Sequence, residues 1–253
     1  VAGVSAMSES GNYGNTKVCQ AMFASADMTL GDDINYVLDA HERASGGRLR
    51  GVRISCGWDD SPQIRNVAAV PRMLNEIRVI EAAQVLGQRG LSLDVWLYHP
   101  QLQELAQLAE KCPELIIILN HVGSPILGGP YKTQHDRVKQ DWLVGVRNLA
   151  DHHNVYVKLG ALPIRLNKIT EGTYDLEKAP TSDEVASVWR PWIEPCIDAF
   201  GPARCMFESN FPVQKNWCSY LVVWNAYKRI ASKYSDEAKC KLFAETARQA
   251  YRI

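Results

Sequence analysis

The chain has 253 residues, of which 46% are hydrophobic, enough for one large domain or two small ones with a sizeable core. Its 28 basic and 28 acidic residues cancel, which argues against a sequence-independent nucleic-acid binder, because such proteins need a basic surplus. No apolar run reaches the ~18–20 residues of a membrane span, so we expect neither nucleic acid nor membrane as a partner.

Strand-like and helical stretches alternate along the whole chain. The apolar run 115–119 (Leu-Ile-Ile-Ile-Leu) is typical of a parallel strand buried on both faces. Ser235 offers an N-cap for the last helix, and Gly90 offers a stop after an earlier one. Repeated alternation predicts βαβ units and a parallel sheet. The expected strands cover residues 18–24, 49–55, 93–98, 115–120, 155–159 and 205–209, and the expected helices cover 32–44, 70–89, 101–111, 134–151, 182–200, 218–233 and 236–251.

Polar side chains stand where these strands end, which is where parallel α/β folds bind their ligands. Two residues on one strand that are two positions apart share a face, so Asn210 should face the same way as Glu208, and His121 the same way as Leu119. An open sheet would spread such residues along a crevice, whereas a closed barrel would gather them around one pit. The strand-end residues are Arg53, His99, His121, Lys158 and Glu208.

Several motifs occur in a characteristic order. They are Arg50-Gly-Val-Arg53, the strand ending at His99, Pro113-Glu-Leu-Ile-Ile-Ile-Leu-Asn-His121-Val-Gly-Ser-Pro125, Asn154-Val-Tyr-Val-Lys-Leu-Gly160, Gly201-Pro-Ala-Arg-Cys-Met-Phe-Glu-Ser-Asn-Phe-Pro212 and the final Ala250-Tyr-Arg-Ile253. With them the chain resembles the amidohydrolase-related family of metal-dependent hydrolases, whose branch includes sugar lactonases and 2-pyrone-4,6-dicarboxylate lactonases. The likeness covers nearly the whole chain from about residue 18.

The resemblance implies an α/β fold, the (β/α)8 TIM barrel. Only about six of the eight βα units can be counted, so we expect an incomplete barrel, with residues 1–253 as a single N-terminally truncated domain. The chain departs from the family pattern in two ways. The first agrees with an incomplete barrel, and the second changes a residue of the expected site. No His-x-His strand occurs, and the last strand reads Glu208-Ser-Asn210-Phe-Pro where the family has Gly-Ser-Asp-Trp-Pro. Asparagine is neutral and cannot take a proton from water.

Members of the family activate a water that attacks a lactone, amide or related carbonyl, and the resemblance assigns roles accordingly. His121 matches a histidine that binds metal or polarises the substrate, and Arg53 an arginine that binds substrate oxygen. We expect these two residues to polarise the carbonyl. Glu208, or a residue upstream of the chain, would activate the water, which Asn210 and His99 would orient. Lys158 is a further substrate-binding candidate.

Each candidate also has a structural interpretation. His121 suits a hydrogen-bonded core histidine, and His99 suits a cap of the following helix. Arg53 and Glu208 would satisfy each other as a buried ion pair. Lys158 would pair with a neighbouring carboxylate.

A catalytic zinc takes three protein ligands and a water. His99 and His121, with a side chain from Glu208 or Asn210, make a marginal set, so we expect either one divalent metal such as Zn2+ or no metal. The scattered cysteines, seven without a CxxC pair, indicate reduced thiols and a cytoplasmic protein.

The sequence therefore favours a hydrolase of a small cyclic ester or similar carbonyl compound, with a small molecule as its partner. Two alternatives stay open: an inactive barrel that only binds a ligand or partner, and a decarboxylase of aromatic acids. Exposed edges of an incomplete barrel would favour a homo-oligomer. Substrate specificity should lie in the loops 124–133 and 163–180.

Overall fold

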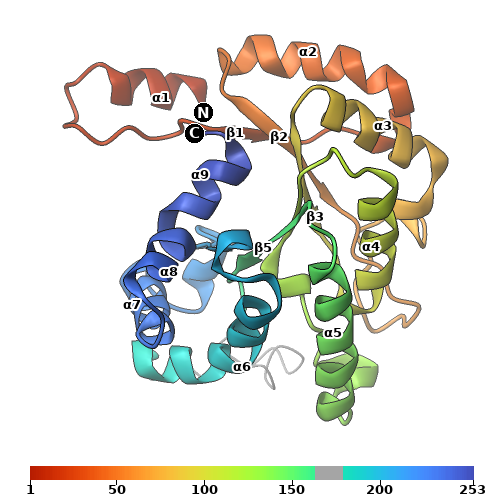
Figure 1. The fold of residues 1–253 in the computed structure, drawn as a ribbon, viewed down its shortest axis with the longest axis vertical. Helices are drawn as coiled ribbons and strands as arrows, with labels where there is room; N and C mark the ends of the chain where they lie inside the picture. Colours follow the sequence, from red (N-terminus) through yellow and green to blue (C-terminus); the bar gives the residue numbers. More distant parts are fainter. Residues whose placement is uncertain (163–178) are drawn as a thin grey trace.

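The computed structural model describes residues 1–162 and 179–253, and its strands form one parallel sheet whose order follows the sequence (Figure 1). All six predicted strands are present, so the parallel α/β prediction is confirmed. The incomplete barrel and the N-terminal truncation stay predictions. Most of the loop predicted over 163–180 lies outside the described residues. The strands are β1 Met22–Ala24, β2 Leu49–Ser55, β3 Ser92–Trp96, β4 Ile117–Leu119, β5 Val155–Leu159 and β6 Cys205–Phe207.

Helices follow the strands as the periodicity indicates, with three differences. The helix expected from residue 70 begins only at Ile77, because Glu76 has an extended backbone with ψ of 134°. A separate short helical turn, Met73–Asn75, comes before it. The last helix is divided by a π-helical turn at Lys241–Glu245, although Ser235 caps it as predicted. Helix α1 was not expected. The helices are α1 Ala2–Glu9, α2 Ile34–Ser45, α3 Ile77–Gln88, α4 Leu102–Lys111, α5 His135–Ala150, α6 Ser182–Phe200, α7 Tyr220–Ala231, α8 Asp236–Cys240 and α9 Thr246–Tyr251.

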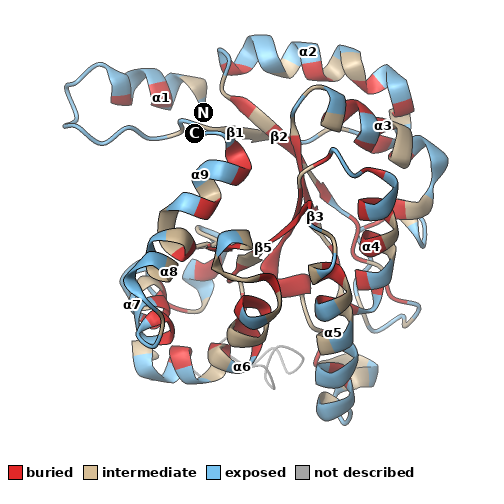
Figure 2. Ribbon diagram, viewed as in Figure 1, coloured by how far each residue is buried: buried red, intermediate tan, exposed pale blue. Residues whose placement is uncertain are grey.

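Apolar side chains pack on both faces of the sheet, and most of the strand residues are buried (Figure 2). The larger cluster joins one face to the helices and includes Leu119, Trp142 and Trp189, all fully buried. A smaller cluster on the other face places Tyr251 of α9 against Ile118. The C-terminal helix therefore covers part of the inner face of the sheet, and burial of each large side chain contributes ~1.5–3 kcal/mol.

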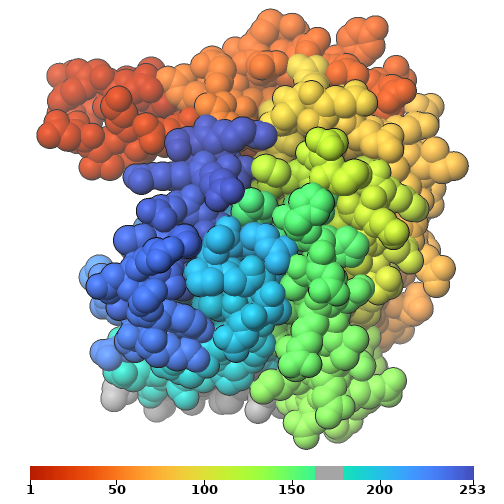
Figure 3. Space-filling view, in the orientation of Figure 1, coloured from red at the N-terminus to blue at the C-terminus, as the bar shows by residue number. Residues whose placement is uncertain are grey.

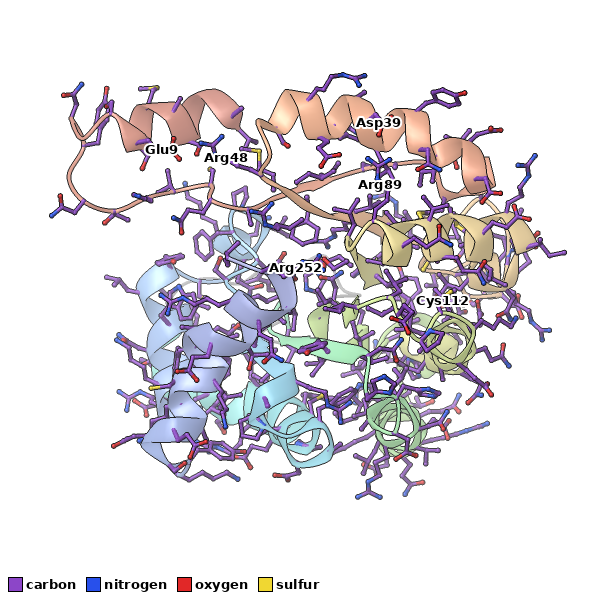
Figure 4. All side chains as sticks on the ribbon, turned by 45° about the horizontal axis from the view of Figure 1, so that its top comes forward. Glu9, Asp39, Arg48, Arg89, Cys112 and Arg252 are labelled. Carbon is purple, nitrogen blue, oxygen red and sulfur yellow. The ribbon has the colours of Figure 1, made fainter. Side chains whose placement is uncertain are left out.

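Helix α1 projects from the body beside the C-terminus (Figures 1 and 3). Both carboxylate oxygens of its Glu9 accept from Nη2 of Arg48, at 2.7 and 2.8 Å, which ties the helix to the residue preceding β2 (Figure 4). Arg89 similarly joins α3 to Asp39 of α2 at 2.7 Å. Within the described ranges, no helix is both long and apolar enough to cross a membrane.

Candidate active site

A cavity of about 870 Å³ opens at the carboxyl ends of the strands. Three of the predicted site residues, Arg53, His121 and Asn210, line it. Apolar wall comes from Trp96 and from Leu162, among others. The remaining candidates, His99, Lys158 and Glu208, lie behind the walls that the structure describes. Three of the six candidates therefore line the cavity, and the sequence did not separate them from the three that do not.

His121 is held through both nitrogens of its ring. Nδ1 hydrogen-bonds to a carboxylate oxygen of Glu208. Nε2 lies 3.2 Å from Nη2 of Arg53. A guanidinium only donates hydrogen bonds, so Nε2 must accept and the ring proton must sit on Nδ1. The network thus assigns a neutral imidazole that donates from Nδ1 to Glu208 and accepts at Nε2 from Arg53. Arg53 and Glu208 each contact His121, which lies between them. They do not form the direct ion pair that the sequence analysis gave as an alternative.

The carboxylate of Glu208 stays ionised in this setting. Burial on its own would raise the pKa of Glu208, but the positive charge of the His121 ring when it is protonated, the hydrogen bond with that ring and the charges of Lys158 and Arg53 bring the pKa below its ordinary value. A charged acceptor strengthens the bond to Nδ1. Glu208 is therefore built to orient the ring and to stabilise positive charge on it.

The backbone turns sharply at the points where the strands end. His121, Val122 and Ser124 all have positive φ, and Asn210 has φ of 50°. Because the chain leaves β4 before His121, strand alternation stops there, and the prediction that His121 shares a face with Leu119 is wrong: Leu119 packs toward the helices whereas His121 lines the cavity. Residues that lie beyond the end of a strand can therefore line the cavity even where strand alternation predicts that they face away from it.

Glu208 also depends on a close approach by Gly160. A Cβ on residue 160 would lie 2.7 Å from Cγ of Glu208 and 2.5 Å from the hydroxyl of Tyr227. That hydroxyl donates a 2.7 Å hydrogen bond to the carbonyl oxygen of Glu208. Glycine at position 160 therefore allows β5 and β6 to end close enough together to set the carboxylate under His121.

Lys158 has the structural role that the sequence gave as its alternative. Its ammonium lies 2.5 Å from Oδ2 of Asp94, and both side chains are largely buried. The hydroxyl of Tyr251 donates to Oδ1 of the same carboxylate at 3.1 Å. Burial raises the pKa of Asp94, an effect that Lys158 and Tyr251 partly offset. This cluster anchors α9 to the inner face of the sheet, and Lys158 does not line the cavity.

His99 supports the cavity wall from behind. It begins the short helical turn His99–Gln101 that precedes α4, as its capping interpretation indicated. Its Nδ1 accepts a hydrogen bond from the backbone N–H of Ile126 at 3.3 Å, and Ile126 lines the cavity. Burial lowers the pKa of His99 to about 4, so the ring is neutral at pH 7 and free to accept this bond.

The described residues do not assemble a metal site. No three side chains of His, Cys, Asp or Glu among them are grouped to hold a metal ion. Nδ1 of His99 already accepts the backbone N–H of Ile126, so this nitrogen is not available to a metal ion. Nε2 of His121 faces a guanidinium, whose charge opposes a cation. The donor set therefore does not fit a three-ligand zinc centre.

Sequence reasoning missed several residues that shape the site. Arg65 and Lys132 line the cavity from loops that follow β2 and β4. Lys132 falls within the loop 124–133 that the sequence named for specificity, and a search for cations in strand-end loops would have found both. Asp94 gave no local signal, because its partner Lys158 stands 64 positions away in the chain.

The protein has a parallel α/β sheet with a polar cavity at the carboxyl ends of its strands. This is where enzymes with parallel α/β folds, the TIM barrels among them, bind their substrates. The sequence profile of the family described as "Amidohydrolase" matches residues 16–253, and the chain belongs to this family. This confirms the resemblance that the motifs indicated.

Two curated relatives support the assignment. The chain is 33% identical over 223 residues to the uncharacterized protein y4mH of Sinorhizobium fredii, covering 87% of this chain and 66% of that protein. It is 25% identical over 209 residues to L-fucono-1,5-lactonase of Burkholderia multivorans, covering 82% and 64%. The chain thus spans about two-thirds of the length of these relatives.

Solved structures share the fold at low identity. An amidohydrolase of Burkholderia multivorans with bound zinc has a TM-score of 0.73 and 22% identity, with 92% of this chain and 74% of that chain covered. A putative 2-pyrone-4,6-dicarboxylic acid hydrolase of Pseudomonas putida has a TM-score of 0.58 and 16% identity, covering 92% and 70%.

Proposed function

We propose that this protein hydrolyses a small cyclic ester, a lactone, with His121 as general base and Arg53 as the group that binds the carbonyl oxygen. The observation that carries the proposal is the position of His121 on the cavity wall between Arg53 and Glu208. Family membership and the L-fucono-1,5-lactonase relative support the reaction class.

The substrate carbonyl enters beside Arg53, where it takes the guanidinium hydrogen bond that Nε2 of His121 now accepts. A water between His121 and the carbonyl carbon gives a proton to Nε2 as its oxygen attacks, a role in which a positioned base contributes ~10²–10⁴-fold. The charge that forms on the carbonyl oxygen is stabilised by Arg53. Asn210, which also lines the cavity, donates to the water or the substrate.

Ring opening completes the reaction. The ester C–O bond of the tetrahedral intermediate breaks, and the leaving ring oxygen takes the proton from Nε2, which gives a hydroxy acid and restores neutral His121. Glu208 acts through His121 as a positioning residue, because its charge stabilises the imidazolium that exists between the two proton transfers. No step needs a metal ion, in keeping with the donor set of the described residues.

The test is hydrolysis of a lactone panel followed with a pH indicator, before and after treatment with a chelator. We expect turnover that survives chelation, a loss of at least about 10²-fold in His121→Ala, and no change in the control His153→Ala, whose side chain is exposed. Absence of hydrolysis, or full activity in His121→Ala, would overturn the proposal. Carbon dioxide released from aromatic acids would point instead to the decarboxylase.

A further inference from the structure

Among the described residues, the charged side chains that line the cavity all have the same sign. Arg53, Arg65 and Lys132 are cationic, whereas no aspartate or glutamate lines the cavity among the residues that the structure describes. His121 adds no negative charge, and the Glu208 carboxylate lies behind its ring. A concave site lined by one sign of charge attracts ligands of the opposite sign.

Arg65 is an exposed member of this set and is presented by a fixed loop. Its carbonyl oxygen accepts a 2.8 Å hydrogen bond from the hydroxyl of Tyr98, which itself lines the cavity. The neighbouring Asn66 is bonded through its side chain to both the N–H and the carbonyl of Asp59, at 2.8 and 2.9 Å. The loop is therefore held at several points, while the exposed guanidinium makes no ion pair with the described residues.

The two arginines stand in different surroundings. Arg53 is partly neutralised, since its charge lowers the pKa of the nearby Glu208. Arg65 has no such carboxylate partner in the described part of the chain. A guanidinium offers parallel N–H donors that match the two oxygens of a carboxylate. A neutral ligand would leave that capacity unused, whereas a carboxylate would satisfy it.

We infer that the substrate is an anion: a lactone whose ring or side chain carries a carboxylate, bound with the ester carbonyl at Arg53 and the carboxylate at Arg65. Trp96, Ile126 and Leu162 provide apolar wall for the body of the ring. This inference rests on the proposed function for the reacting end of the site, but the carboxylate subsite itself requires no turnover. It distinguishes an acidic lactone from a neutral sugar lactone.

The test compares two lactones of nearly equal shape, 5-oxotetrahydrofuran-2-carboxylate and 5-oxotetrahydrofuran-2-carboxamide. We expect kcat/KM to be at least about tenfold higher for the carboxylate at low ionic strength, and the preference to shrink as salt is added. Arg65→Gln should raise KM for the carboxylate about tenfold with little effect on the carboxamide, because it removes only charge recognition. Arg43→Gln, an exposed arginine on α2, serves as the matched control and should change neither.

Equal rates for the two lactones, or equal losses for both in Arg65→Gln, would overturn the inference. If neither lactone is hydrolysed, the proposed function fails at that step, and binding is then measured by calorimetry with tetrahydrofuran-2-carboxylate and its carboxamide. Selective binding of the carboxylate that Arg65→Gln abolishes would support the subsite without turnover. Equal binding, or none, would contradict it.

Discussion

Arg53 and His121 stand 68 positions apart in the chain, yet Nη2 of one lies 3.2 Å from Nε2 of the other. This contact fixes the proton of the neutral ring on Nδ1, which donates a hydrogen bond to the Glu208 carboxylate, and leaves Nε2 as the basic atom of the ring. Under the proposed function, the ring is thereby set to take a proton before any substrate enters.

The contact predicts that the shape of the Arg53 side chain matters as well as its charge. Arg53→Lys keeps a cation but loses the planar fork. We expect kcat for lactone hydrolysis to fall by about 10²-fold, in the range seen when one donor to a developing oxyanion is removed. Steady-state kinetics would measure the loss. Wild-type kcat in Arg53→Lys would show that a point charge is sufficient at this position.

Gly160 should be intolerant of any side chain. In Gly160→Ala the new Cβ would meet the Glu208 side chain and the Tyr227 hydroxyl, so the end of β6 must shift. We expect unfolding free energy to fall by about 1–3 kcal/mol, and kcat to fall because the carboxylate moves away from His121. Urea denaturation and kinetics together test this. Gly3→Ala is the control, since a Cβ there meets nothing within 4 Å.

Removing one partner of the buried pair Lys158 and Asp94 should lower the unfolding free energy far more than removing both charges. Lys158→Met would leave a buried carboxylate without its cation, which costs about 3–5 kcal/mol of unfolding free energy. The double variant Lys158→Met/Asp94→Asn removes the charge as well and should recover most of that loss. Urea denaturation of the three proteins measures it. A double variant no more stable than the single one would mean that the cation–π packing of Lys158 on Tyr251 dominates.

His99 should make stability depend on mildly acidic pH. Burial lowers its pKa in the folded chain to about 4, below the ordinary 6.5, so the unfolded chain binds more protons between these values. The stabilisation is complete above pH 6.5 and is lost as pH falls, by about 2 kcal/mol at pH 5.

The variant His99→Asn isolates this effect, because its amide oxygen can accept the Ile126 N–H without titrating. Urea denaturation at pH 7.5 and pH 5 should show wild-type protein losing about 2 kcal/mol more than His99→Asn between the two values. Equal losses in both proteins would contradict a neutral, buried His99.

The sequence by itself determined the sheet, because strand and helix periods are local and hydrophobic burial follows them. It also placed polar residues at the strand ends, since parallel strands carry all their carboxyl ends to one edge. The motifs identified the family. The sequence did not predict three features: the π-helical turn, the late start of α3 and helix α1. Each depends on backbone geometry or packing that no short sequence pattern encodes.

The tertiary structure alone decided what each polar residue does. His121 lies at the centre of the network because its positive φ turns it away from the face that strand alternation predicts. It thereby lies between Arg53 of β2 and Glu208 at the end of β6. Lys158 is also a polar residue near the end of a predicted strand, but it forms an ion pair with Asp94 and does not line the cavity. These assignments depend on distances between strands that are remote along the chain, and a charge can be satisfied only by the partner that the fold brings within reach.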